Sequence, residues 1–257
     1  MLGALQGPTE LLPVSSSGHL VLLPELLGWA HAELDPELRK SFEVALHAGT
    51  AAALAIVLRG EVAEVLGELD AARVARHAAA LAPPALAVVA FERAIEERLG
   101  SARVVAAAQI AAGLALGAAD TRPATRERDD AGVLDHALIG LGQAAALVPG
   151  VSRNGATLTA ARLRRFRRPA ANRLSRHAAL PIILAATALK GHRLAKRGLP
   201  PVLRAPFVAG ATAAFASTLA CRGLIRRMDE AGTYAPYAAY RVALGTAALA
   251  MLRRGGT

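Results

Sequence analysis

The chain has 257 residues, of which 54% are hydrophobic and only 4% aromatic, and its formal net charge is +10. Its arginines cluster between apolar runs, most densely from Ala161 to His177, and aromatic residues are almost absent among them. This pattern argues against a nucleic-acid partner and favours cytoplasmic loops under the positive-inside rule. The single cysteine, Cys221, excludes an intrachain disulfide.

Seven apolar runs follow one another along the chain. Each is shorter or richer in alanine than the roughly 20 apolar residues of an ideal spanning helix, so each alone could be a buried soluble helix. Together, with compact Arg-rich connections between them, they predict an all-α, polytopic membrane bundle whose small residues allow close packing. The runs cover residues 44–58, 78–91, 104–119, 137–148, 178–189, 206–221 and 238–252.

A polar stretch, "LPVSSSGH" (residues 12–19), precedes the first run. We expect Pro13 and Gly18 to interrupt a helix, and the backbone groups that they free must find partners if the segment lies in hydrocarbon. The serine hydroxyls satisfy part of that demand, but they do not explain His19. An ionisable side chain at membrane depth is costly and indicates a functional site.

A second break occurs in "VPGVSRNGAT" (residues 148–157). Shifting the chain by 137 residues places Gly3 on Gly140, Gln6 on Gln143, Val14-Ser15 on Val151-Ser152, and Gly18 on Gly155. A helix, a polar break and another helix once per half is typical of inverted-repeat membrane proteins. We therefore predict one integral membrane domain over 1–257, with repeats at about 1–119 and 133–252.

The polar residues of the two breaks suggest phosphoryl or acyl transfer. Gln6 and Glu10 share one helix face, and Ser16 lies three residues before His19, within reach of a local hydrogen bond. Arg153 offers a planar fork of donors suited to phosphate oxygens. At the start of the first apolar run, Glu43 and His47 share a helix face. They either pair structurally or take a direct catalytic role, and we expect them to support the site from behind.

The segments "LQGPTELLPVSSSGHL" and "ALVPGVSRNGAT" resemble the two signature segments of the undecaprenyl-diphosphatase family, the bacitracin-resistance membrane phosphatases of bacteria. "FEVALHAGT", "LIGLGQAAALVPG" and "PYAAYR" are similar to further family segments, so the resemblance covers nearly the whole chain. It implies a bundle of two inverted repeats, each holding a re-entrant helix pair whose tips meet at the active site.

The resemblance implies hydrolysis of undecaprenyl diphosphate to the monophosphate, which recycles the lipid carrier of peptidoglycan synthesis and confers bacitracin resistance. The expected partners are this lipid and membrane lipids, with a homodimer left open, in a multi-pass protein of the inner (plasma) membrane. A divalent cation is left open and no organic cofactor is expected. The expected catalytic residues are Glu10, Ser16, His19 and Arg153, and the expected substrate-binding residues are Gln6, Ser15, Ser17, Gly18, Ser152, Asn154, Gly155 and Thr157.

In the mechanism that we expect, Ser16 attacks the distal phosphorus, His19 takes its proton and Glu10 orients the imidazole. A direct attack by His19 stays open as the rival. We also expect the substrate pocket to open on the extracytoplasmic side.

Two other functions compete with this interpretation. A type-2 phosphatidic acid phosphatase would need a histidine six residues after the arginine, where this chain has Thr159. A transporter or flippase of polyprenyl phosphate would also use broken helices around an anion. Ser16 and His19 discriminate, because a transporter needs hydrogen-bond donors but no nucleophile and base.

Overall fold

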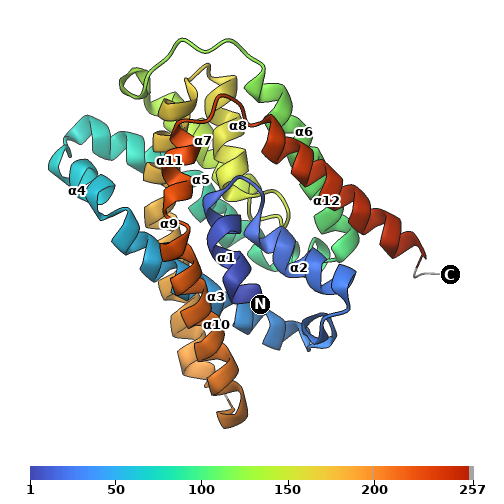
Figure 1. The fold of residues 1–257 in the computed structure, drawn as a ribbon. Coiled ribbons are helices and arrows are strands. Elements are labelled where there is room, and N and C mark those ends of the chain that lie inside the picture. The colour runs from blue at the N-terminus through green and yellow to red at the C-terminus, as the bar shows by residue number, and fades with distance from the viewer. Residues whose placement is uncertain (199, 255–257) are drawn as a thin grey trace.

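The computed structural model describes residues 1–198 and 200–254, and it confirms the predicted all-α fold. The described residues form twelve α-helices and two short 3₁₀ helices, with no strand among them (Figure 1). The elements are α1 (Leu2–Leu11), α2 (Ser16–Leu27), η1 (Ala30–Glu33), α3 (Pro36–Val57), α4 (Arg59–Gly67), α5 (Ala71–Arg98), α6 (Ala102–Asp120), η2 (Arg128–Asp130), α7 (Val133–Ala145), α8 (Arg153–Leu163), α9 (Arg168–Arg197), α10 (Pro201–Ala220), α11 (Gly223–Asp229) and α12 (Ala235–Arg254).

Four of these helices are long and apolar enough to cross a membrane, namely α3, α5 (as far as Ile95), α6 and α10. Large apolar side chains point away from the protein on them: Leu86 is 70% exposed, Val89 88% and Val208 65%. A soluble protein of this size would not leave such long apolar faces uncovered. Length, composition and outward apolar faces therefore agree with the predicted membrane bundle.

Helix pairing follows the order of the two proposed repeats. In chain order, the first half runs α1, α2, α3, α5, α6 and the second half runs α7, α8, α9, α10, α12. The corresponding helices α6 and α12 pack together, as do α3 and α9, while α1 packs on α10 and α7 packs on α5. A two-fold relation between the halves would produce this exchange of partners, although the inverted repeat itself stays a prediction.

Both predicted helix breaks are present, and a serine with positive φ stands at each of them, joined in the second break by Gly150 (φ 95°). Ser15 precedes α2 with φ 74°, and Ser152 precedes α8 with φ 67°, values rarely adopted by side-chain-bearing residues. Each Oγ accepts a hydrogen bond of 3.1 Å from a backbone N–H three residues on, at Gly18 and Gly155. The expectation that Gly18 interrupts the helix was wrong, because Gly18 lies in the first turn of α2.

The arginine-rich segment 161–177 runs from the end of α8 into α9 and forms a dense network of ion pairs at one end of the bundle. Arg162 is buried and contacts Asp120, to which Arg168 also donates. Further partners of the segment come from α4, α7, α11 and the residue before η2: Arg164 pairs with Asp135, Arg167 with Glu127, Arg173 with Glu64, and Arg176 with Glu61 and Asp229. These pairs hold the connections at this end, here called the arginine-rich end, against one another.

Candidate active site

Glu10 connects the two helix breaks. It lies in the last turn of α1, and its side chain is mostly buried. Its Oε1 accepts a hydrogen bond of 2.6 Å from Arg153 Nη2, at the start of α8. Its Oε2 accepts one of 2.7 Å from the Ser16 hydroxyl, at the start of α2. Two expected catalytic residues, Ser16 and Arg153, are thus hydrogen-bonded to a third, Glu10.

Two further polar residues extend this group toward α3. Gln6 lies one turn before Glu10, and its Nε2 is 3.1 Å from Nδ1 of His47. The same His47 nitrogen is 4.0 Å from Glu10 Oε2. His47 therefore lies closer to the carboxylate than expected for a residue that only supports the site from behind. Glu43 lies on the same helix, one turn earlier.

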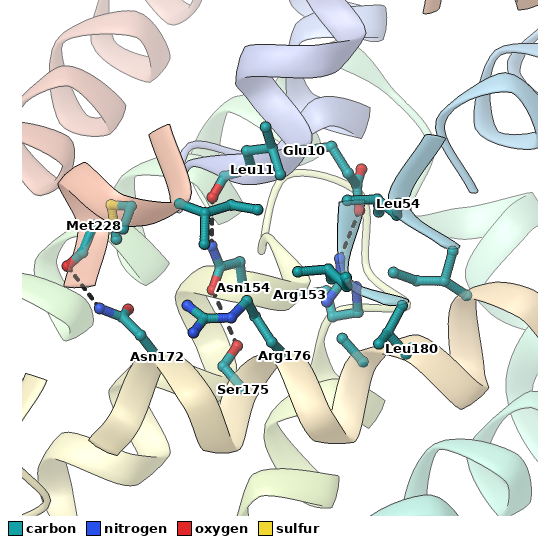
Figure 2. Close-up of a pocket in the computed structure, with 14 residues that line it drawn as sticks. Glu10, Leu11, Leu54, Arg153, Asn154, Asn172, Ser175, Arg176, Leu180 and Met228 are labelled. Carbon is teal, nitrogen blue, oxygen red and sulfur yellow. Dashed lines mark hydrogen bonds and ion pairs between the residues drawn. The ribbon is translucent and has the colours of Figure 1, made fainter. Parts of the chain in front are cut away.

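The residues after Arg153 tie the second break to the first. Asn154 donates from Nδ2 to the Leu11 carbonyl at 3.0 Å and accepts from Ser175 of α9 at 3.0 Å (Figure 2). Thr157 is fully buried, and its hydroxyl lies 2.6 Å from that of Ser175. These contacts fix the start of α8 against the end of α1, which holds Arg153 at Glu10.

His19 has its hydrogen-bond partners outside this group. The imidazole is 3% exposed; its Nδ1 donates to the Ser15 carbonyl at 2.7 Å, and its Nε2 lies 2.6 Å from the Tyr240 hydroxyl. The two rings are also stacked, 5.6 Å apart. Both ring nitrogens already have partners, so the expected contacts of His19 with Ser16 and Glu10 are absent from this structure.

The remaining expected binding residues make hydrogen bonds or close contacts that stabilise the two helix breaks. The Ser15 and Ser152 hydroxyls cap their helices as described, and both side chains are buried. Ser17 Oγ lies 3.3 Å from Ser15 Oγ and accepts from the backbone N–H of Gly150 at 3.3 Å, which joins the first break to the second. A side chain at Gly155 would collide with the guanidinium of Arg241.

Arg241 is a residue whose role sequence reasoning missed. It is completely buried, on α12, and its guanidinium donates to the carbonyls of Gly150 and Val151 at 2.9 and 2.7 Å and to that of Pro13 at 3.4 Å. It thereby satisfies backbone acceptors of both breaks. The signal was present in "PYAAYR", where a charged residue stands in an apolar helix.

A small cavity of about 40 Å³ lies beside Glu10 and Arg153. Figure 2 shows these two side chains meeting, with Asn154, Ser175 and Arg176 further along the wall. The rest of its lining is mainly apolar and comes from α1, α3 and the residue after it, α9 and α11: Leu11, Leu54, Leu58, Asn172, Ala179, Leu180, Ile183, Ile225 and Met228. The cavity thus combines a charged end with apolar walls, as an amphiphilic ligand requires.

The cavity lies on the arginine-rich side of Glu10. Ser175 and Arg176 belong to the segment 161–177, and Arg176 is paired with carboxylates of α4 and α11. We predicted that these arginines face the cytoplasm and that the substrate pocket opens on the extracytoplasmic side. Because this cavity lies next to the arginines, the two predictions conflict if it is the substrate pocket. Among the described residues, no group of three or more His, Cys, Asp or Glu side chains is placed to hold a metal ion.

Comparison with known proteins places the chain in a family. The family model described as "Bacitracin resistance protein BacA" matches residues 1–247. A protein of Geobacter sulfurreducens is 41% identical over 98% of this chain and 96% of its own length, and one of Chromohalobacter salexigens is 38% identical over 95% and 94%. Both relatives are named undecaprenyl-diphosphatase. The chain therefore belongs to the bacitracin resistance protein BacA family.

Proposed function

We propose that this chain is an integral membrane phosphatase that hydrolyses undecaprenyl diphosphate to undecaprenyl phosphate and inorganic phosphate. The observation that carries the proposal is Glu10, whose two oxygens hold the Ser16 hydroxyl and the Arg153 guanidinium. A nucleophile, a proton acceptor and an anion-binding cation are thus within one bonded unit. The name shared by the relatives supplies the substrate.

In the proposed reaction, Ser16 Oγ attacks the distal phosphorus while its proton moves to Glu10, and the bridging P–O bond breaks to release undecaprenyl phosphate. Water then hydrolyses the phosphoserine. Glu10 takes the part first given to His19, because Oε2 is 2.7 Å from the serine oxygen. Ser16 is the better candidate nucleophile because both ring nitrogens of His19 are engaged, with Ser15 and Tyr240.

Arg153 has two successive tasks in this proposal. Before substrate binds, it neutralises Glu10. A diphosphate competes for the same guanidinium, which offers a bidentate fork to phosphate oxygens. Binding therefore loosens the ion pair and leaves Glu10 available to accept a proton. Arg153 then stabilises the negative charge on the transferred phosphoryl group.

In this proposal, the first part of the lipid chain packs against the apolar wall of the cavity. Leu54, Leu180 and Ile183 continue from the charged end. Burial of each methylene group contributes about 0.8 kcal/mol, so a long polyprenyl chain should bind far better than a short one. The protein would recycle the carrier lipid of cell-wall synthesis in the inner (plasma) membrane and confer bacitracin resistance.

A transporter or flippase of polyprenyl phosphate is not favoured. The relatives are named as phosphatases, and transport alone gives no reason to hold a serine hydroxyl against a carboxylate. The second break and its helix N-terminus would serve either function, so they do not discriminate.

The test is phosphate release by the purified full chain from undecaprenyl diphosphate in detergent, with and without a chelator. Wild type should release phosphate and Ser16→Ala should not, whereas Ser101→Ala, the same change at an exposed helix cap, should keep full activity. A short-chain diphosphate at the same low concentration should be a poorer substrate. Lack of phosphate release by wild type under all conditions would refute the proposal.

A further inference from the structure

A second cavity, of about 170 Å³, lies at the arginine-rich end and does not include Glu10 or Arg153. Elements α4, α5, η2, α7 and α9 and their connections surround it. Its polar lining is mainly basic: Arg73, Arg76, Arg128, His77, His136 and His177. The proposed phosphatase reaction uses none of these residues, so the cavity needs an explanation of its own.

Two of the three arginines are already paired. Arg128 donates to Glu64 at 2.6 Å and to Asp129 at 3.2 Å. Arg73 lies 3.7 Å from Glu68. Asp129 and Glu68 are also the two carboxylates in the lining, so three guanidinium groups face two carboxylates.

Arg76 carries the excess positive charge. Across residues 1–198 and 200–254, its side chain has neither a hydrogen bond nor an ion pair, and it influences Asp70 and His136 only through space. Asp70 is itself committed as the cap of α5, where it accepts from the backbone N–H of Arg73 at 2.7 Å. A half-buried guanidinium that makes no ion pair within the protein can bind an anionic ligand.

The imidazoles add further donors on the same cavity. The rings of His77 and His136 meet edge to face, 6.1 Å apart. His136 Nδ1 donates to the Gly132 carbonyl at 2.9 Å, which leaves Nε2 for another partner. His177 Nε2 lies 3.4 Å from Glu61. An anion placed between Arg76 and the first two rings would favour their protonated, donating forms.

The cavity lies beside the ends of two candidate membrane spans. The candidate span in α3 ends at Val57 and the one in α5 begins at Ala71, and one side of the cavity consists of residues that join and follow these ends, including Arg73 and Arg76. Three large apolar side chains on the same elements point away from the protein: Leu66 is 62% exposed, Leu69 44% and Val74 53%. Basic groups beside exposed apolar ones at the end of a span suit an interfacial lipid.

We propose that this cavity binds the phosphate group of an anionic phospholipid, with Arg76 as its main cation and the acyl chains along Leu66, Leu69 and Val74. Free inorganic phosphate has the same headgroup chemistry but would make no use of the apolar side chains. The site is separate from the proposed catalytic group, so its occupancy can be measured independently of catalysis.

The experiment is native mass spectrometry of the full chain in detergent, titrated with phosphatidylglycerol, with phosphatidylcholine of the same acyl chains, or with inorganic phosphate. Arg76→Gln should weaken phosphatidylglycerol binding about fivefold, the effect expected for one basic residue near an anionic headgroup. Phosphatidylcholine binding should not change. Arg98→Gln, the same substitution at an exposed position near the other end of α5, is the matched control and should bind like wild type.

Folding of Arg76→Gln is checked by its phosphate release, which should equal that of wild type. Equal phosphatidylglycerol affinity in Arg76→Gln and wild type would overturn the proposal. A loss confined to inorganic phosphate would also overturn it, because the ligand would then come from solution. An equal loss in Arg98→Gln would show a diffuse charge effect and no site.

Discussion

Arg153 and Glu10 lie 143 residues apart in the chain and are joined by a hydrogen bond of 2.6 Å between Nη2 and Oε1. The bond crosses from the second helix break to the first. The other Glu10 oxygen accepts the hydrogen bond of the Ser16 hydroxyl. A substitution at Arg153 therefore also alters the carboxylate that positions the proposed nucleophile.

Arg153→Lys should lower kcat by about 10²-fold or more, a loss typical for one donor to the charge that develops in the transition state. Lysine keeps the charge but lacks the planar fork that can hold Glu10 and then two phosphate oxygens. Steady-state phosphate release measures the effect. Arg167→Lys, the same change at an exposed arginine, is the control and should have no effect. Near-normal turnover of Arg153→Lys would mean that a diffuse positive field is enough.

Arg241→Met should lower both thermal stability and activity. The substitution leaves buried carbonyls of Pro13, Gly150 and Val151 without a donor, and each such group costs about 1–3 kcal/mol. Arg241→Lys should recover part of the stability but less of the activity, because one ammonium cannot reach both breaks in the same geometry. Thermal unfolding in detergent and kcat, measured side by side, test this. An Arg241→Met protein with wild-type stability would contradict the assigned role.

The breaks and their meeting could be predicted from the sequence, because the relevant signals are local or repeated. Val14-Ser15 and Val151-Ser152 stand in matching positions, and each serine caps a helix. The contact of Arg153 with Glu10 agrees with the family resemblance, which implies that the two tips meet. The number of spans did not follow in the same way: the sequence shows seven apolar runs, whereas four helices among the described residues are long and apolar enough to cross a membrane.

The position of His19 could not be predicted, because its partner is distant in sequence. Local spacing suggested Ser16, but Tyr240 lies 221 residues away and takes the ring nitrogen. The arginine-rich segment posed the same difficulty. Its carboxylate partners come from separate elements, as Asp120, Asp135 and Asp229 illustrate, and the sequence does not tell which arginine meets which.

The arginine-rich end should face the cytoplasm, under the positive-inside rule. In a Cys221→Ser background, Arg167→Cys should be protected from a membrane-impermeant thiol reagent in intact cells and labelled in inverted vesicles. Ile225→Cys, in the wall of the cavity beside Glu10, should react from the same side as Arg167→Cys if the cavity opens at this end. Labelling of Arg167→Cys from outside intact cells would reverse the orientation.

Stability should fall in acid through Glu61 of α4. Burial raises the pKa of this carboxyl, but the hydrogen bonds and charges of His177 and Arg176 outweigh it and lower the pKa from 4.5 to about 2. A lowered pKa in the folded state stabilises the protein above pH 4.5, and this contribution is lost as the pH falls toward 2. Glu61→Gln should therefore show a shallower fall in unfolding temperature below pH 4.5 than wild type. An unchanged slope, or the same change in Glu25→Gln at an exposed site, would contradict this.

The final prediction concerns the attacking atom. Ser16→Ala and Glu10→Gln should each reduce kcat by about 10³-fold or more, and the double variant should be little worse than either single one, because groups that act as a unit do not lose activity additively. Phosphate release under single-turnover conditions measures the chemical step. His19→Gln should lower activity and stability together, because the imidazole joins Ser15 of the first break to Tyr240 of α12.

Trapping the intermediate decides between the two nucleophiles. A phosphoryl group on Ser16 is stable in acid and labile in base, whereas one on an imidazole is labile in acid. Acid quenching of the reaction with labelled undecaprenyl diphosphate should leave the label on wild type and none on Ser16→Ala. An acid-labile label that survives in Ser16→Ala and disappears in His19→Gln would assign the attack to His19. Because both His19 nitrogens are engaged, that attack would require the ring to leave Tyr240 first. Tyr240→Phe, which removes that hydroxyl partner, should then increase the label on His19, whereas attack by Ser16 predicts no label there.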